Sequence, residues 1–376
     1  MTLFMRTSLL YVSVFMVLGA AMLFLSPWLI ERGFTPTEIG YLSAVTILLR
    51  LFTGPLLGLA LDRARRPELL FAGLSAGLAA SYCGFILSED KFLIVLAVCM
   101  TAVFWSATLP AAEAYGVTAS EQKGLDYGRM RLWGSVAFIV SGIAMGEISD
   151  RWSLDLLPWW LTLFSLLLIG AAYLQRGPVA LRDRSRLPHM GDIFILLGTR
   201  RFALVALGTG LIQTSHAVFY VFGTVHWQSL DYSDRTIGIL WAVGVIAEIA
   251  LFAVSGRLTE RFNVARLAIL AGFLGVVRWS VMAIDPPLTA VFFVQAIHGF
   301  TFGAVHLAAM RYLGREIAPN LMATGQSLYA ALLGVLMGVV IAICGPLYTA
   351  FGGATYYAMV VLCLLAIPVL LAARKT

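Results

Sequence analysis

Long apolar runs alternate with short polar breaks along the whole chain, and this alternation is the main feature of the sequence. A membrane-spanning α-helix needs about 20 apolar residues, and the runs reach that length. The pattern predicts an all-α membrane protein with twelve transmembrane helices. The expected spans are 7–30, 37–60, 68–88, 92–116, 127–147, 157–175, 202–222, 236–256, 266–284, 288–312, 322–343 and 346–373.

The composition supports a membrane protein. Of the 376 residues, 60% are hydrophobic and 12% are charged, with a mean hydropathy of +0.89. Soluble domains carry about 25% charged residues, so that class is excluded. The four cysteines lie in apolar spans without the spacing of metal ligands, so we expect neither a metal site nor a cofactor.

The basic residues predict the orientation in the membrane, because cytoplasmic loops retain Lys and Arg. With a cytoplasmic N-terminus, the basic residues of the outer loops are only Arg32, Lys91, Arg151 and Arg235. Both termini are therefore expected in the cytoplasm. The net charge of +6 follows from this topology and gives no reason to expect nucleic-acid binding.

The two halves of the chain share residues at a constant offset of 198 positions. Ile39-Gly40 matches Ile237-Gly238, and Asp62-Arg63 matches Glu260-Arg261. A basic, less apolar stretch joins the halves. We expect two pseudo-symmetric six-helix bundles at 1–175 and 202–376, joined by a cytoplasmic linker at 176–201. Such a repeat is typical of transporters that bind their substrate between the halves.

The segment GLALDRARRPELL, residues 58–70, resembles the loop signature that follows the second helix in the major facilitator superfamily. It lacks the Gly that usually follows Asp-Arg-x. Asp62 can accept charge-assisted hydrogen bonds from neighbouring helix ends, while Arg63 stays at the cytoplasmic face. We expect these two residues, and Glu260 and Arg261 in the second half, to control conformational change.

Five ionised residues are expected deep in the predicted spans, where an unpaired charge costs at least about 2.5 kcal/mol. They are Arg50, Glu113, Arg131, Glu248 and Arg278. Glu113 and Arg131 flank a short polar turn, so they can pair across a helical hairpin; a purely structural pair is the alternative. The five carry one excess positive charge, which an anionic substrate or a change of protonation would neutralise.

Two predicted spans carry a polar stripe along one helix face, at spacing i, i+3, i+7. In lipid, such a stripe must face protein or water, although helix packing remains the alternative for any single histidine. The stripes consist of Gln213, His216 and Tyr220, and of Gln295, His298, Phe302 and His306.

Several segments closely resemble the 3-phenylpropionate transporter branch of the major facilitator superfamily, a relative of lactose permease. These are the hairpin around Glu113, LDYGRMRLWGSVAF, GVVRW and QAIHGFTFGAVHLAAMRY, and the resemblance covers essentially the whole chain. It implies a transporter of the bacterial inner (plasma) membrane that acts as a monomer.

The resemblance also implies roles for single residues. Glu113 and Arg131 match the sugar-binding carboxylate and arginine of lactose permease, and Arg278 and His298 match its arginine and histidine tied to proton coupling. The proton-carrying carboxylate of the permease, one turn after that histidine, is Thr301 here.

Proton symport is therefore implied, but the carrier differs from the permease. Glu248 lies one turn further along its helix than the glutamate of the permease. We expect Glu248 to carry the proton, because burial favours the neutral form of a carboxyl group. His298 and His306 are the second candidates.

The leading hypothesis is a proton-coupled symporter that imports a small organic anion such as an aromatic carboxylate. Its partners would be the substrate, protons and the lipid bilayer. Arg131 or Arg278 would bind the carboxylate. The other substrate-binding candidates, most of them aromatic, are Trp133, His216, Tyr220, Trp241 and Phe302.

Four alternatives remain open. Sugar or nucleoside uptake would use hydrogen bonds to Glu113 in place of a salt bridge to arginine. Drug efflux is a further transport function. A membrane enzyme would need a motif such as HExxH or GxSxG, and the sequence has neither, so we expect no enzyme. A non-transporting sensor is disfavoured because Glu113 and Glu248 are retained.

Overall fold

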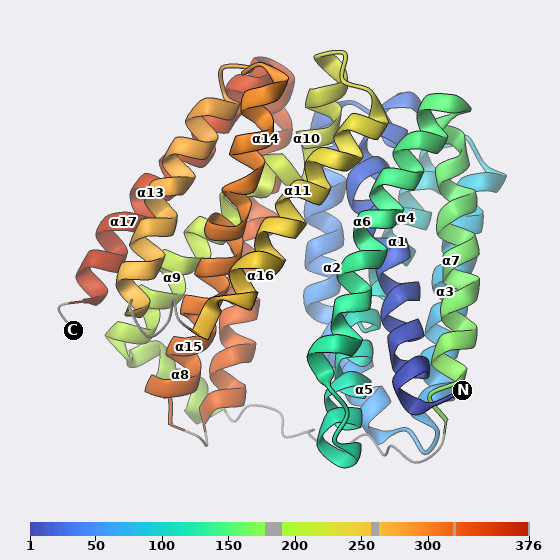
Figure 1. Cartoon of the computed structure of the whole chain (residues 1–376), viewed down its shortest axis with the longest axis horizontal. Coiled ribbons are helices and arrows are strands. Elements are labelled where there is room, and N and C mark those ends of the chain that lie inside the picture. The colour runs from blue at the N-terminus through green and yellow to red at the C-terminus, as the bar shows by residue number, and fades with distance from the viewer. Residues whose placement is uncertain (177–189, 257–262, 319–320, 375–376) are drawn as a thin grey trace. The chain divides into compact units, whose positions relative to one another are not determined.

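The computed structural model describes residues 1–176, 190–256, 263–318 and 321–374, and within these ranges all regular elements are helices (Figure 1). The prediction of an all-α membrane protein is confirmed. The helices are α1 (Leu3–Glu31), α2 (Pro36–Arg63), α3 (Pro67–Leu87), α4 (Lys91–Trp105), α5 (Thr108–Lys123), α6 (Tyr127–Arg151), η1 (Leu154–Leu156), α7 (Leu157–Tyr173), α8 (Met190–Gly198), α9 (Arg200–Thr214), α10 (Ala217–Ser229), α11 (Asp234–Ala253), α13 (Val264–Met282), α14 (Leu288–Ala296), η2 (Gly299–Ala304), α15 (Val305–Glu316), α16 (Met322–Phe351), η4 (Gly352–Thr355) and α17 (Tyr356–Ala373).

Among the described residues, 11 helical stretches are long and apolar enough to cross a membrane. The last stretch, Thr324–Ala373, contains both α16 and α17, so it accounts for two of the twelve predicted spans. Three stretches are interrupted inside the apolar run: α4 is followed by α5, α9 by α10, and α14 by η2 and α15. Transporters build binding sites at such interruptions, where backbone groups are freed from helical hydrogen bonds.

The chain forms two compact units, each with most of its packing inside itself. Unit 1 consists of Met1–Thr35, Val45–Ser185 and Trp227–Ala242, and unit 2 of Pro36–Ala44, Arg186–His226 and Val243–Thr376. Helices α2 and α11 therefore each have their first turns in one unit and the remainder in the other. The division into halves at 1–175 and 202–376 stays a prediction.

Helix α1 forms the centre of unit 1, where it packs against α6, α7 and α5 (Figure 1). Its buried side is mainly apolar, and hydrogen bonds link it to neighbouring helices: Ser141 of α6 donates to the Met16 carbonyl over 2.6 Å. The Trp160 indole of α7 donates to the Ser141 hydroxyl at 3.2 Å. These bonds satisfy polar groups that lipid could not, so they fix the three helices against one another.

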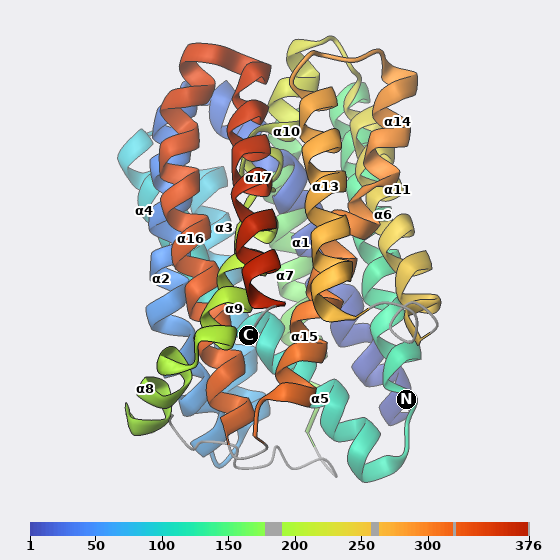
Figure 2. The same cartoon turned by 90° about the vertical axis from the view of Figure 1, so that its left-hand side faces the viewer.

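In unit 2, α17 packs against α13 and α9, and α13 and α17 lie side by side in Figure 2. Helices α9, α13, α15 and α17 bury a common apolar cluster that includes Ile212, Leu267, Val305 and Leu370. This cluster holds the interrupted helices α9 and η2 in place beside α13.

The first turns of α2 and α11 make very close backbone contacts. A Cβ on Gly40 would lie 2.7 Å from the Cα of Gly345 in α16, within unit 2. A Cβ on Gly238 would lie 2.7 Å from the Gly142 carbonyl oxygen in α6, within unit 1. Gly40 and Gly238 match at the 198-residue offset, and at both positions a neighbouring backbone lies too close for a side chain.

Asp150, at the end of α6, caps the start of α11. Its Oδ1 accepts a hydrogen bond from the Asp234 amide at 2.8 Å, and its Oδ2 accepts one from the Arg235 amide at 2.9 Å. A helix start leaves four amides without intrahelical partners and carries a partial positive charge, so a carboxylate there satisfies two of the amides and is electrostatically favoured.

Replacing Asp150 with Ala leaves these two amides unpaired and is expected to lower stability by about 1 kcal/mol. Thermal unfolding of the purified protein in detergent measures the change. Glu89→Ala is the control, because Glu89 is 88% exposed and lies 3.9 Å from Arg32. An unchanged unfolding temperature for Asp150→Ala would contradict this role of Asp150.

Candidate functional site

The first cluster of ions lies in unit 1, on the hairpin formed by α5 and α6. Gly124 caps the end of α5, and its φ of +65° suits a residue without a side chain; Asp126 caps the start of α6, where its carboxylate accepts from the Arg129 amide. This short polar turn reverses the chain and brings Glu113 and Arg131 to the same side of the hairpin.

Glu113 and Arg131 form an ion pair with 2.8 Å between Oε1 and Nε. The other carboxylate oxygen, Oε2, accepts hydrogen bonds from the hydroxyls of Tyr11 at 2.8 Å and Tyr127 at 2.6 Å. The Arg131 guanidinium also lies over the Phe15 ring, 4.3 Å from its centroid. The charge of Arg131 is thus matched by Glu113, and the carboxylate has a partner on both oxygens.

The second cluster lies in unit 2, where two helices are interrupted. Helix α9 ends at Thr214 and α10 begins at Ala217, so His216 sits in the break. The helix that follows α14 has a six-residue π-helical turn, η2, which is a rare conformation found frequently at functional sites. The Gln213 amide donates to the Phe302 carbonyl in this turn at 3.3 Å.

Arg278 of α13 is the centre of this cluster and is fully buried. Its Nη1 donates to His298 Nδ1 and to Thr301 Oγ1, both at 3.0 Å, and its Nη2 donates to Gln295 Oε1 at 2.9 Å. All three acceptors are neutral groups.

The charge of Arg278 has no carboxylate partner among the residues that the structure describes. Its Nε also has no hydrogen-bond partner there. The guanidinium lies 4.3 Å from the Trp279 ring centroid and 5.0 Å from that of Phe219. Cation–π contacts of this kind stabilise a buried cation only in part, by about 2 kcal/mol when it is desolvated. Among the described contacts, Arg278 is therefore held by neutral acceptors and aromatic rings.

The hydrogen bonds assign the proton positions of both histidines. His298 Nδ1 faces a guanidinium, which can only donate, so this nitrogen is an acceptor and the ring is neutral. His216 Nδ1 lies 3.2 and 3.1 Å from the carbonyl oxygens of Ile212 and Gln213, so it carries a hydrogen. His216 Nε2 lies 3.2 Å from Thr301 Oγ1, and the Thr301 hydroxyl is also 3.4 Å from the His298 carbonyl oxygen.

Aromatic rings surround these polar groups. His216 stacks on Tyr220 with 5.5 Å between centroids, and His298 stacks on Phe302 at 5.4 Å. Phe302 in turn stacks on His306 at 6.3 Å. The structure thus brings together six of the predicted residues: His216, Tyr220, Arg278, His298, Phe302 and His306.

Glu248 of α11 lies beside η2. Its Cγ is 3.4 Å from the position that a Cβ on Gly303 would occupy, and its charge interacts with the Tyr220 side chain. Glu248 is therefore next to this cluster.

Two predicted aromatic residues lie apart from the clusters. Trp133 is 51% exposed on the face of α6 that also exposes Val136 and Val140, whereas Arg131, two positions earlier, faces Phe15. Trp241 is buried in the part of α11 that belongs to unit 1.

The predicted conformational residues are only partly described. Asp62 is half-buried and Arg63 is exposed, at the end of α2. Glu260 and Arg261 lie outside the described residues.

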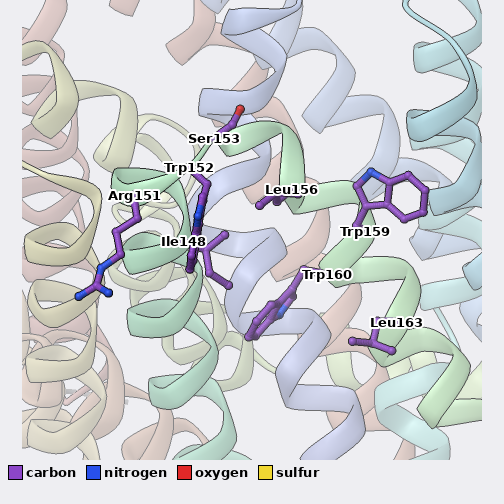
Figure 3. Close-up of a pocket in the computed structure, with 8 residues that line it drawn as sticks. All are labelled: Ile148, Arg151, Trp152, Ser153, Leu156, Trp159, Trp160 and Leu163. Atoms are coloured by element: carbon purple, nitrogen blue, oxygen red, sulfur yellow. The ribbon is translucent and has the colours of Figure 1, made fainter.

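An open groove of about 840 Å³ lies at the ends of α6 and α7 (Figure 3). Arg151, the ionised residue of its lining, is paired with Glu147, and the rest of the lining is mainly apolar. The groove therefore differs from the two clusters, one of which contains a half-buried ion pair and the other a fully buried arginine. Its lining residues are Ile148, Arg151, Trp152, Ser153, Leu156, Trp159, Trp160 and Leu163.

Sequence reasoning missed several members of the clusters. Tyr11, Phe15 and Tyr127 contact the Glu113–Arg131 pair, and Phe219 and Trp279 contact Arg278. Trp279 could have been found, since it follows Arg278 directly. Tyr11 and Phe15 gave no signal, because they lie in an apolar span with no polar periodicity.

Comparisons with known proteins agree with this architecture. The chain matches the MFS_1 like family over residues 4–359. It is 30% identical over 361 residues to the probable 3-phenylpropionic acid transporter of Escherichia coli (strain K12), covering 94% of this chain and 93% of that protein. It is 27% identical to the maltose permease of Geobacillus stearothermophilus, covering 86% and 82%.

The fold is shared with a solved transporter structure. The nucleoside transporter NupG superposes with a TM-score of 0.82 over 100% of this chain and 99% of that one, at 15% identity. Both the twelve-helix fold and the predicted resemblance are confirmed. The chain therefore belongs to the MFS_1 like family and is a membrane transporter of the major facilitator superfamily.

Proposed function

We propose that this transporter is a proton-coupled symporter of a small aromatic carboxylate, with 3-phenylpropionate as the reference compound. The observation that carries the proposal is the fully buried Arg278, whose charge no carboxylate of the described residues balances. An ion in such surroundings is unfavourable unless a counter-ion arrives, and a substrate carboxylate is a suitable counter-ion.

The two candidate arginines differ in availability. Arg131 already has Glu113 at 2.8 Å, so a substrate carboxylate near Arg131 would also meet the negative charge of Glu113. Arg278 donates only to neutral acceptors and keeps its Nε without a partner in the described part of the chain. This contrast favours Arg278 as the group that binds the carboxylate.

The surroundings of Arg278 favour an aromatic substrate. Phe219, Trp279, Tyr220 and Phe302 provide ring faces close to the guanidinium and to the two histidines. Aromatic pairs contribute about 0.5–1.5 kcal/mol beyond the burial of apolar area, so a phenyl ring would gain from these faces. The name of the Escherichia coli relative, a probable 3-phenylpropionic acid transporter, supports the same class of substrate.

Charge balance couples the anion to a proton in this proposal. His216 and His298 are neutral beside a cation, because a second positive charge there would be repelled. A bound carboxylate would cancel the charge of Arg278, and the cluster could then accept a proton. Glu248, next to η2 and Tyr220, is the proposed carrier, with His298 and His306 as second candidates.

The alternating-access cycle would move the half at 1–175 against the half at 202–376, with both termini in the cytoplasm and the protein acting as a monomer. Opening the outer side would separate the first turns of α2 from α16 and those of α11 from α6. The close contacts at Gly40 and Gly238 support these two places as the ones that separate, because no interlocked side chains would have to come apart there.

Proton-coupled uptake of a sugar or nucleoside is the second candidate. The Glu113 carboxylate with its two tyrosine hydroxyls offers hydrogen bonds suited to substrate hydroxyls, and the relatives include a maltose permease. In that function Glu113, and not Arg278, would determine specificity.

Arg278→Gln is expected to weaken binding of 3-phenylpropionate by roughly 10- to 100-fold, because a charge-assisted hydrogen bond contributes about 1.5–3 kcal/mol. Isothermal titration of the purified protein measures the affinity. The wild-type protein should also prefer the acid over 3-phenylpropionamide, which has the same shape without the charge.

Arg129→Gln is the matched control, because Arg129 is 80% exposed and its ion pair is with the nearby Asp126. Its affinity should equal that of the wild type. Two results would favour the sugar or nucleoside function. One is equal binding of the acid and the amide; the other is an unchanged affinity in Arg278→Gln together with a lost affinity in Glu113→Gln.

Glu248→Gln is expected to abolish accumulation of labelled 3-phenylpropionate in proteoliposomes with an inward proton gradient, while exchange of internal for external substrate continues. The neutral side chain cannot release a proton, so the gradient no longer drives uptake. Exchange serves as the internal control for folding and binding. Gradient-driven accumulation in this variant would exclude Glu248 as the carrier and leave His298 and His306.

A further inference from the structure

A third group of titratable side chains lies in unit 2, apart from Arg278. It joins His226 near the end of α10, Asp285 in the turn between α13 and α14, and Tyr348 near the end of α16. His226 Nε2 lies 2.8 Å from Asp285 Oδ1, and His226 Nδ1 lies 3.3 Å from the Tyr348 hydroxyl. Both ring nitrogens are therefore engaged, each by a different segment.

The backbone around this group leaves little freedom. Asp285 has a φ of +49°, a left-handed conformation that costs energy for a residue with a side chain. At Gly353 in η4, a Cβ would lie 2.5 Å from His226 Cε1 and 2.6 Å from Asp285 Oδ1. The strained turn and the missing side chain allow the carboxylate to reach the imidazole, so the pair is a specific feature of this fold.

Water can reach this pair from one side. The His226 side chain is only 5% exposed, whereas that of Asp285 is 48% exposed. Imidazole is the side chain that changes charge between about pH 5 and 8. On the predicted topology this end of α10 faces the outside, so the pair experiences the external pH.

Protonation changes the hydrogen bonds of the ring in a defined way. In the described part of the chain, its titratable contacts include Asp285, Tyr348 and Tyr356, whose ring lies 5.9 Å away edge-on. In the neutral ring, Nε2–H donates to Asp285 and Nδ1 accepts from the Tyr348 hydroxyl. In the charged ring both nitrogens donate, so the Tyr348 oxygen becomes an acceptor and both bonds become charge-assisted and stronger.

Tyr348 connects this change to the start of α2. The next residue, Thr349, has its hydroxyl 2.8 Å from that of Thr37, and Gly345, one turn earlier, forms the close contact with Gly40. Tyr348 also stacks on Phe222 of α10, with 4.7 Å between centroids. A firmer bond from His226 to Tyr348 therefore holds the part of α16 that packs on α2.

We propose that His226, Asp285 and Tyr348 form a proton-responsive clamp that holds α16 against the first turns of α2 more firmly when His226 is charged. His226 acts through Tyr348 and is thus a positioning residue. The clamp itself does not depend on the proposed transport function. Its effect on transport does: external protons would favour the state in which α2 and α16 are in contact.

The test uses the full chain in membrane vesicles, with its four natural cysteines replaced by Ala and with Thr37→Cys and Thr349→Cys added. The measured quantity is the pH ratio, which is the rate of oxidant-induced disulfide formation at pH 5.5 divided by the rate at pH 8. Thiol ionisation affects this ratio equally in the parent and in His226→Gln, so comparing the two proteins removes that effect. The parent ratio is expected to exceed that of His226→Gln by about threefold, and Asp285→Asn should resemble His226→Gln.

Two further variants make the result decisive. Tyr348→Phe keeps the ring stacked on Phe222 but loses the hydroxyl, so it should abolish the extra pH dependence even where His226→Gln folds poorly. Asp231→Asn is the matched control, because Asp231 is an exposed aspartate with a similar φ of +61° and should behave as the parent does.

Equal pH ratios in the parent, Tyr348→Phe and Asp285→Asn would overturn the clamp. The cross-linking requires no substrate, so the outcome is independent of the aromatic-acid proposal. A pH-dependent cross-link without 3-phenylpropionate binding would retain the clamp and reject that substrate. Binding of 3-phenylpropionate without a pH-dependent cross-link would retain that substrate and reject the clamp.

Discussion

The free-energy cost of a positive charge inside the membrane is the constraint on which the interior of this transporter depends. Arg278 is fully buried, and the surrounding groups are arranged to make that tolerable with neutral partners alone: an amide oxygen, a hydroxyl, an imidazole nitrogen and two aromatic faces. Each partner lowers the cost without cancelling the charge. The charge therefore stays within the cluster without an ion pair among the described contacts, and this is the property on which the proposed binding of an anion rests.

The two clusters handle charge in opposite ways. In unit 1 the Glu113–Arg131 pair is neutral overall, and two tyrosine hydroxyls complete the hydrogen bonds of its carboxylate. In unit 2 the cation is kept without a carboxylate among the described residues. One unit thus holds a neutral, hydrogen-bonded pair and the other a cation bound by neutral acceptors, so the two clusters differ in the kind of ligand group that each would accept.

The sequence predicted the features that depend on local pattern. Run length and charge distribution gave the helical membrane fold, and the polar turn between two apolar runs predicted that Glu113 and Arg131 pair. Patterns could not show which partners come from distant helices. Tyr11 and Phe15 are apolar-span residues like their neighbours, and His226 was overlooked because its partners, Asp285 and Tyr348, are separated from it by 59 and 122 positions. Trp133, expected to stack on the ring of an aromatic substrate, is 51% exposed on the face of α6 that also exposes Val136 and Val140.

The break between α9 and α10 gives His216 a second task. Its Nδ1 hydrogen is shared between the carbonyls of Ile212 and Gln213, which lie where the helix is interrupted. Each carbonyl oxygen has a further donor, the Ser215 hydroxyl at 2.7 Å for Ile212 and the His216 amide at 3.2 Å for Gln213. Turning the ring away would leave the Nδ1 hydrogen without these acceptors in a low-dielectric interior, at a cost of roughly 1–3 kcal/mol. The ring therefore rests in one of a few discrete positions and does not drift between them. Recognition at this point would have a threshold: a ligand that binds weakly leaves the helix as it is, and only one that replaces those bonds can reshape it.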